Sequence, residues 1–245
     1  MDLLGVTKWL VKDTGRYDLV TDTTTWADNP TGTSPGAYHY INTAQRILDR
    51  MQDTPHASRW FFKVPAAGDR TVEMQYVRSI EEVWYSNATV GRVEVERVDL
   101  ADLRGNYYEP TADVENGYPA YYAVNVEGVS PENTTLTAFT DTEDVITGEP
   151  SLYRGITFMP PSDGSYTMRI RAKMYCKPLS SSTDTSYWTI QCPEALVLVA
   201  KWLLEGLLRN ADGMAALERA IRPILTDMDK DMADEDSVNV SQMEG

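Results

Sequence analysis

The sequence is poor in the residues from which disulfide frameworks, metal sites and histidine-based catalysis are built. It has only two cysteines and two histidines in 245 residues. Neither Cys176 nor Cys192 belongs to a CxxC pair of the zinc-binding kind, and His39 and His56 form no HExxH pattern. We therefore expect no metal and no cofactor, and two thiols that stay reduced in the cytoplasm where the protein is made.

Positive charge is also scarce. The chain has 22 Lys and Arg against 37 Asp and Glu, a formal net charge of -15 and a sequence pI of about 4.5. Proteins that bind nucleic acid without sequence preference gain affinity by releasing counterions at a basic surface. The charge balance therefore argues against this class of function.

No hydrophobic run is long enough to cross a membrane. The longest, residues 195–208, is interrupted by Lys201 and Glu205, and it is shorter than the roughly 20 residues that span a bilayer. The first ten residues are too short and too polar for a secretion signal. We expect residues 195–208 to form a buried helix.

The sequence contains none of the glycine-rich catalytic motifs. GxSxG, GxxxxGK[ST] and GxGxxG are all absent, although each is needed to present a nucleophile or backbone amides in a tight turn. Paired acids such as Glu81 with Glu82, and Glu94 with Glu96, are expected by chance among 37 acids. A solvated face is the better interpretation of these pairs, and we predict that the protein is not an enzyme.

One acidic run resembles the start of an EF-hand calcium loop. Asp227, Asp229 and Asp231 match its first three ligand positions. The sixth position, which needs glycine for the turn, is Met232, and the twelfth, which needs a bidentate glutamate, is Val238. An acidic helix end or tail is therefore the better interpretation.

The residues that are present predict helices at both ends of the chain. Hydrophobic residues make up 42% of the sequence, which is enough for a real core. Apolar residues recur at helical spacing in 37–53, namely Tyr40, Ile41, Ala44, Ile47, Leu48 and Met51. Pro193 is a good first residue for a helix running to about Asn210, and a final helix is expected from near Met214.

The middle of the chain predicts strands. Runs rich in aromatic and β-branched residues occupy 59–64, 72–76, 80–85, 121–126, 153–159 and 166–175. We predict that the first two form a hairpin and that the last two pair with each other, with a short helix at 98–104. In the last strand Arg169, Arg171 and Lys173 alternate with apolar residues, which predicts a basic stripe that contacts an acidic neighbouring subunit.

The sequence therefore predicts an α+β fold, in which a central antiparallel β-sheet region is flanked by N- and C-terminal helices packed into a helical bundle. Residues 1–36 form an N-terminal arm and loop, and 37–56 form the first helix, which joins 193–226 in the bundle. Residues 57–192 form a β-rich domain with a long loop at 127–150. An acidic C-terminal segment, 227–245, follows.

Ten stretches in this order resemble the adaptor, or neck, proteins of tailed-bacteriophage head-to-tail connectors. They are residues 24–28 (TTWAD), 60–62 (WFF), 80–84 (IEEVW), 117–122 (GYPAYY), 155–161 (GITFMPP), 165–169 (SYTMR), 175–179 (YCKPL), 183–184 (TD), 187–188 (YW) and 192–194 (CPE). The resemblance covers residues 26–210 and lies in the borders of strands and helices. No catalytic signature contributes to it.

This resemblance implies a structural protein of the virion that forms a ring, with a dodecamer as the expected homo-oligomer. Its partners would be the portal protein above and a tail or nozzle protein below. Genomic DNA would pass through the lumen without sequence-specific binding, and no membrane would be involved. The location would be the head-tail junction, with the host cytoplasm as the site of assembly.

In this family a C-terminal helix or arm engages the portal. Leu225, Met228 and Met232 form a sparse apolar stripe among aspartates, which is too thin to stabilise a helix by itself. We therefore expect this stripe to become ordered by docking between portal subunits.

Two other functions stay open from the residues alone. A carbohydrate-binding β module of a phage tail would use exposed aromatic side chains to stack on sugar rings. A carboxylate-dependent hydrolase would need two acids with opposed, strongly shifted pKa values in one pocket.

Overall fold

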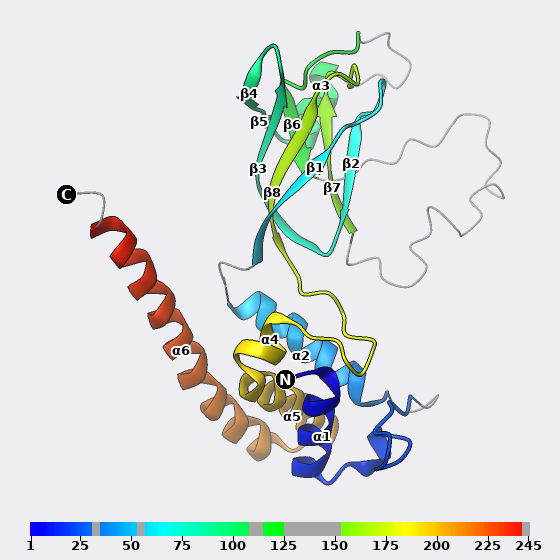
Figure 1. Cartoon of the computed structure of the whole chain (residues 1–245), viewed down its shortest axis with the longest axis vertical. Coiled ribbons are helices and arrows are strands. Elements are labelled where there is room, and N and C mark those ends of the chain that lie inside the picture. The colour runs from blue at the N-terminus through cyan, green and yellow to red at the C-terminus, as the bar shows by residue number, and fades with distance from the viewer. Residues whose placement is uncertain (31–34, 53–56, 108–114, 125–152, 242–245) are drawn as a thin grey trace, which may run out of the picture. The chain divides into compact units, whose positions relative to one another are not determined.

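The structure is a computed structural model, and it describes residues 1–30, 35–52, 57–107, 115–124 and 153–241. The chain divides into two compact units. The helical unit comprises Met1–His56 and Cys176–Gly245, and the β unit comprises Ala57–Tyr175 (Figure 1). The loop predicted at 127–150 lies outside the described residues.

The helical unit is built around one apolar helix. Its elements are α1 (Leu3–Thr14), a 3-10 turn η1 (Tyr17–Leu19), α2 (Ala37–Met51), α4 (Tyr187–Gln191), α5 (Pro193–Leu207) and α6 (Ala211–Ser241). Helix α5 packs against α1, α2, α4 and α6. It is apolar on most of its circumference, with Leu196, Val197 and Ala200 all buried, as expected of a central helix. The predicted α+β class, with terminal helices packed together, is confirmed.

The C-terminal helix is longer than the sequence predicted. We expected residues after 226 to form a separate segment, yet α6 runs unbroken from Ala211 to Ser241, with Pro223 inside it. Ile221 and Leu225 anchor its middle turns in the core of the helical unit. Because extending a formed helix costs much less than nucleating one, the acidic sequence continues the helix that these residues hold. Among the described residues, no helix is both long and apolar enough to cross a membrane.

Residues 176–192, which we had assigned to the β-rich domain, belong to the helical unit. Polar side chains on one face of α2 hold them. Asn42 donates from Nδ2 to the Leu179 carbonyl (2.9 Å) and accepts from the Leu179 amide at Oδ1 (2.8 Å). Gln45 Nε2 donates to the carbonyl of Lys177 (3.0 Å). Side chains of α2 thus supply hydrogen bonds that the backbone of this segment would otherwise make with a neighbouring strand.

The same segment caps the first helix. The backbone amides of Leu3 and Leu4 donate to the carbonyls of Asp184 (2.9 Å) and Ser182 (3.0 Å). Asp2 accepts from the Gly5 amide at 2.8 Å. The first amides of a helix have no partner inside it, so these bonds satisfy α1 and fix the path of 180–186.

The β unit is a sandwich of two four-stranded sheets. Its strands are β1 (Ser58–Lys63), β2 (Thr71–Gln75), β3 (Val77–Asn87), β4 (Gly91–Glu94), β5 (Glu96–Arg97), β6 (Tyr121–Val124), β7 (Tyr153–Met159) and β8 (Thr167–Met174). One sheet has the order β1-β8-β3-β4 and the other β2-β7-β6-β5, and only β5 and β6 pair in parallel. Side chains of both sheets, including Phe158 and Ile170, meet in one buried core.

The strand pairs differ from those we predicted. Strand β1 pairs with β8 and β2 pairs with β7, so the first two strands are not a hairpin. Strands β7 and β8 lie in opposite sheets, so their predicted pairing is also wrong. At Tyr76, with φ of 60°, the chain passes from β2 in one sheet to β3 in the other. A sandwich buries the apolar faces of two sheets against each other, and consecutive strands therefore need not be neighbours.

The helix predicted at 98–104 is present as α3 (Leu100–Tyr107). Leu103 is buried against Ala123 of β6 and Met159 of β7. This small cluster lies apart from the main core of the sandwich, which indicates that α3 covers part of the second sheet.

Candidate interaction surface

The side chains of most functional interest lie on the outer face of the sheet β1-β8-β3-β4. We use "outer face" for Trp60, Phe62, Glu81, Glu82, Trp84, Arg92, Glu94, Arg169, Arg171 and Lys173. Along β8, Met168, Ile170 and Ala172 are buried. Because side chains alternate along a strand, Arg169, Arg171 and Lys173 project to the opposite side. The predicted basic stripe therefore lies on this face.

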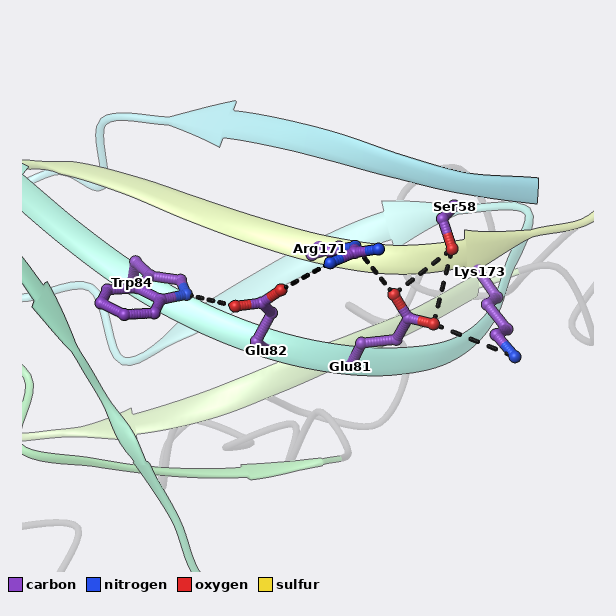
Figure 2. A network of polar contacts seen from close by, with 6 residues as sticks. All are labelled: Ser58, Glu81, Glu82, Trp84, Arg171 and Lys173. Carbon is purple, nitrogen blue, oxygen red and sulfur yellow. Dashed lines mark hydrogen bonds and ion pairs between the residues drawn. The ribbon is translucent and has the colours of Figure 1, made fainter. Parts of the chain in front are cut away.

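A bulge in β3 brings two carboxylates to one guanidinium. The register between β3 and β8 shifts between Ile80 and Glu82, so Glu81 is an extra residue opposite β8. Consecutive residues of a regular strand point to opposite sides, but the bulge lets Glu81 and Glu82 both reach Arg171. The Nε–Oε2 distance to Glu81 is 3.1 Å and the Nη1–Oε1 distance to Glu82 is 3.0 Å (Figure 2).

Further contacts extend this network along the sheet. Lys173 Nζ lies 3.9 Å from Glu81 Oε1. The indole Nε1 of Trp84 donates to Glu82 Oε2 at 2.6 Å, and Ser58 lies within hydrogen-bonding distance of Glu81 (Figure 2). The hydrogen bond from Trp84, followed by that from Arg171, holds the pKa of Glu82 below its usual value. Glu82 is therefore an anion at neutral pH and serves to orient its neighbours.

Aromatic rings and arginines cover the rest of the face. The guanidinium carbon of Arg92 lies 4.1 Å from the ring centroid of Trp84 and 5.2 Å from that of Trp60. The guanidinium carbon of Arg169 lies 5.7 Å from the centroid of Phe62. Trp60 is 40% exposed and Phe62 is 64% exposed. Cation–π contacts of this kind hold flexible arginines in place while the aromatic edges stay open to solvent.

The residues predicted to bind the portal do not form one exposed surface. Leu225 is buried in the core of the helical unit, and Met228 packs against that core from its edge. The side chain of Met232 lies outside the described residues. The helical unit itself buries Leu225, and docking of this stripe on the portal stays a prediction.

Of the other residues singled out from the sequence, His56 lies outside the described residues, and His39 and Asp227 lie in ordinary structural positions. His39 packs edge-on against Tyr40 of α2, and Asp227 is part of the continuous helix α6, where Lys230 pairs with it at 3.2 Å. Within the described residues, no group of three or more His, Cys, Asp and Glu is placed to hold a metal ion.

Both cysteines are free thiols, and their environments differ. Cys176 is partly exposed, whereas Cys192 is buried, and burial raises the pKa of its thiol. Because the thiolate is the reactive form, we expect an alkylating reagent to label Cys176 within minutes and Cys192 only after local opening. Peptide mass spectrometry after timed labelling under nonreducing conditions measures this order. A disulfide between the two cysteines, or equal labelling rates, would contradict it.

The sequence matches no protein-family model and no curated protein. The outer face and the resemblance to connector adaptor proteins are therefore the two observations that bear on the function.

Two features of the outer face could not be found from the sequence alone. The pair Glu81 and Glu82 looked like chance adjacency, and its meaning depends on the bulge. Arg92 was not singled out, because nothing near it in the sequence shows that its guanidinium lies over Trp60 of β1 and Trp84 of β3. A signal was present for Trp60 and Phe62, since a strand carrying WFF predicts more apolar surface than one buried face needs.

Proposed function

We propose that the protein is a structural adaptor subunit of a tailed-bacteriophage head-to-tail connector. In this proposal it forms a homo-oligomeric ring, which joins the portal protein to the tail or nozzle protein and surrounds the DNA channel. It acts at the head-tail junction of the virion after assembly in the host cytoplasm. It performs no reaction and needs no cofactor.

The outer face is the observation that supports this proposal best. Tryptophan, phenylalanine and arginine are enriched in the centres of protein interfaces, and Trp and Arg are frequent hot-spot residues. Here they are partly immobilised before any partner binds, by the ion pairs to Arg171 and the ring contacts of Arg92 and Arg169. Binding to such a surface loses less side-chain entropy than binding to a mobile one.

The charge of the chain fits a DNA channel. A net charge of -15 makes the protein as a whole repel phosphate, so that DNA would slide past without being retained. The division into a helical unit and a β unit, each with its own core, supplies two distinct bodies with which to contact two different partners.

Features of the outer face weigh against both alternatives. A carbohydrate module stacks sugars on free ring faces, whereas Arg92 already lies over the rings of Trp60 and Trp84. A hydrolase needs one carboxyl group whose pKa is raised, but Glu82 has a lowered pKa and shares Arg171 with Glu81.

Co-assembly with the portal tests the proposed function. The purified protein, mixed with portal rings from the phage that encodes it, is expected to add a further ring visible by electron microscopy. A matched sample with an unrelated ring-forming protein in place of the portal controls for nonspecific stacking. Failure to bind portal rings at protein concentrations well above those of assembly would overturn the proposal, as would hydrolysis of a glycan by the pure protein.

A further inference from the structure

Strands β1 and β4 are the two edges of the sheet β1-β8-β3-β4. Strand β1 is protected against pairing with a strand of another chain. Its residues Arg59 and Lys63 are exposed and alternate with Trp60 and Phe62, so they project away from the outer face. Charged residues, lysine above all, on an edge strand discourage pairing with a strand of another chain. A contact at this sheet is therefore better placed on the outer face than on the β1 edge.

The outer face is locally basic on an acidic protein. It has four cations, Arg92, Arg169, Arg171 and Lys173, and three acids. Glu81 and Glu82 pair with Arg171 and Lys173, and Glu94 lies opposite Trp84 in the register of β3 and β4. Among the described residues, Arg92 and Arg169 have no carboxylate at ion-pair distance. These two guanidinium groups leave the face able to bind carboxylates from a partner.

The last turns of α6 carry the complementary charge. Residues 227–236 contain Asp227, Asp229, Asp231, Asp234, Glu235 and Asp236 but only Lys230 as a cation. The helix continues through all of them to Ser241, beyond Leu225, the last buried residue of α6 that the structure describes. Asp227 is largely exposed, with 74% of its side chain accessible.

We propose that the acidic end of α6, residues 227–236, docks on the outer face of a second copy of this chain. Arg92 and Arg169 receive its carboxylates, and Trp60 and Phe62 pack beside the helix. This inference rests on the proposed function in one respect only, which is that copies of the chain assemble with one another. Such a contact is heterologous, because each copy presents one face and one helix end. Successive contacts of this kind form a ring where the rotation from copy to copy closes.

The charge of the protein favours a second copy of this chain as the partner that binds the outer face. Identical subunits with a charge of -15 repel one another, so an interface between them needs a patch of opposite sign on one side. The outer face supplies this patch. Double-stranded DNA could also meet four cations, but the acidity of the chain around them opposes its approach.

The test uses two variants that each lose one half of the contact. The face variant carries Arg92→Glu and Arg169→Glu, and the helix variant ends at Lys230, which keeps Ile221, Leu225 and Met228. The wild type is expected to self-associate in sedimentation velocity, and each variant alone to do so about a hundredfold more weakly. Mixed together, the variants are expected to form a heterodimer that grows no further, because only one complementary pair of surfaces remains.

The matched control is Arg59→Glu, which reverses a charge on β1 but not on the outer face. It is expected to associate like the wild type, and an equal loss would place the contact on the strand edge and overturn the proposal. A mixture of variants that stays monomeric also overturns it, as does binding of a DNA duplex that the face variant loses while self-association is unchanged. Circular dichroism spectra like that of the wild type show that each variant folds.

These outcomes separate the inference from the proposed function. Self-association that follows the predicted pattern, in a protein that never binds portal rings, keeps the inference and removes the proposed function. Rings that form on the portal with undiminished occupancy by the face variant keep the proposed function and remove the inference.

Discussion

Replacing Asp49 by alanine is expected to lower the free energy of unfolding of the helical unit by about 3 kcal/mol. Asp49 is only 7% exposed. Its Oδ1 accepts from the indole Nε1 of Trp188 (2.7 Å) and its Oδ2 from the amide of Cys176 (2.8 Å). Alanine removes the acceptor of a buried indole and of a partly buried amide. Leaving a buried donor without an acceptor costs more than the net value of the hydrogen bond. Urea unfolding followed by tryptophan fluorescence measures the change.

Asp13→Ala is the matched control for this prediction. Asp13 also accepts from an indole, that of Trp9 (2.9 Å), and pairs with Lys201 (2.6 Å), but its side chain is 42% exposed. Solvent replaces these partners, so we expect a loss below about 1 kcal/mol. Equal effects of the two substitutions would show that burial does not decide the strength of these contacts. Asp49→Asn is expected to lie between them, because its amide keeps an acceptor for Trp188 but turns a donor toward the amide of Cys176.

Replacing Phe158 by alanine is expected to destabilise the β unit by about 3–5 kcal/mol. The side chain is fully buried in the core between the two sheets, and its loss leaves a cavity that two paired sheets cannot easily close. Because each unit has its own core, we expect the helical unit to keep its own stability. Hydrogen exchange by mass spectrometry, which reports the two units separately, measures both effects.

Phe62→Ala provides the comparison for Phe158. This substitution also removes a phenylalanine side chain, but from the outer face, where Phe62 is 64% exposed. We therefore expect a change in stability within about 0.5 kcal/mol. The same substitution is expected to weaken association of the chain with itself. A large loss of stability from Phe62→Ala would mean that the side chain serves the fold, and it would remove Phe62 from the proposed interface.

The buried Asp49 illustrates what the sequence does not reveal. Its place on the apolar side of α2 is visible from helical spacing, but its partners come from residues 176 and 188, far along the chain. Asn42 and Gln45 likewise bind a segment that sequence reasoning placed in the other domain. Which distant segment fills the polar positions of a helix depends on the packing of the whole unit.

The sequence predicted the basic residues of the candidate interaction surface but not their partners. Alternation along one strand was enough to place Arg169, Arg171 and Lys173 together, because side-chain direction in a strand is a local property. The glutamates that neutralise Arg171, and the tryptophans beneath Arg92, come from other strands. The sequence therefore predicted a basic stripe without ion pairs. Among the described residues the structure instead has a network that pairs Arg171 and Lys173 with carboxylates and leaves Arg92 and Arg169 without them.

Local sequence pattern by itself determined the α+β class, the apolar helix that begins at Pro193 and the alternation along β8. Each follows from spacing that the backbone imposes within a single element. Only the tertiary structure decided that β1 and β2 lie in different sheets, that residues 176–192 join the helical unit, and that Leu225 is buried. It also decided that a bulge turns Glu81 and Glu82 toward one arginine. These features depend on which surfaces are buried against each other, and burial is a property of the packed chain as a whole.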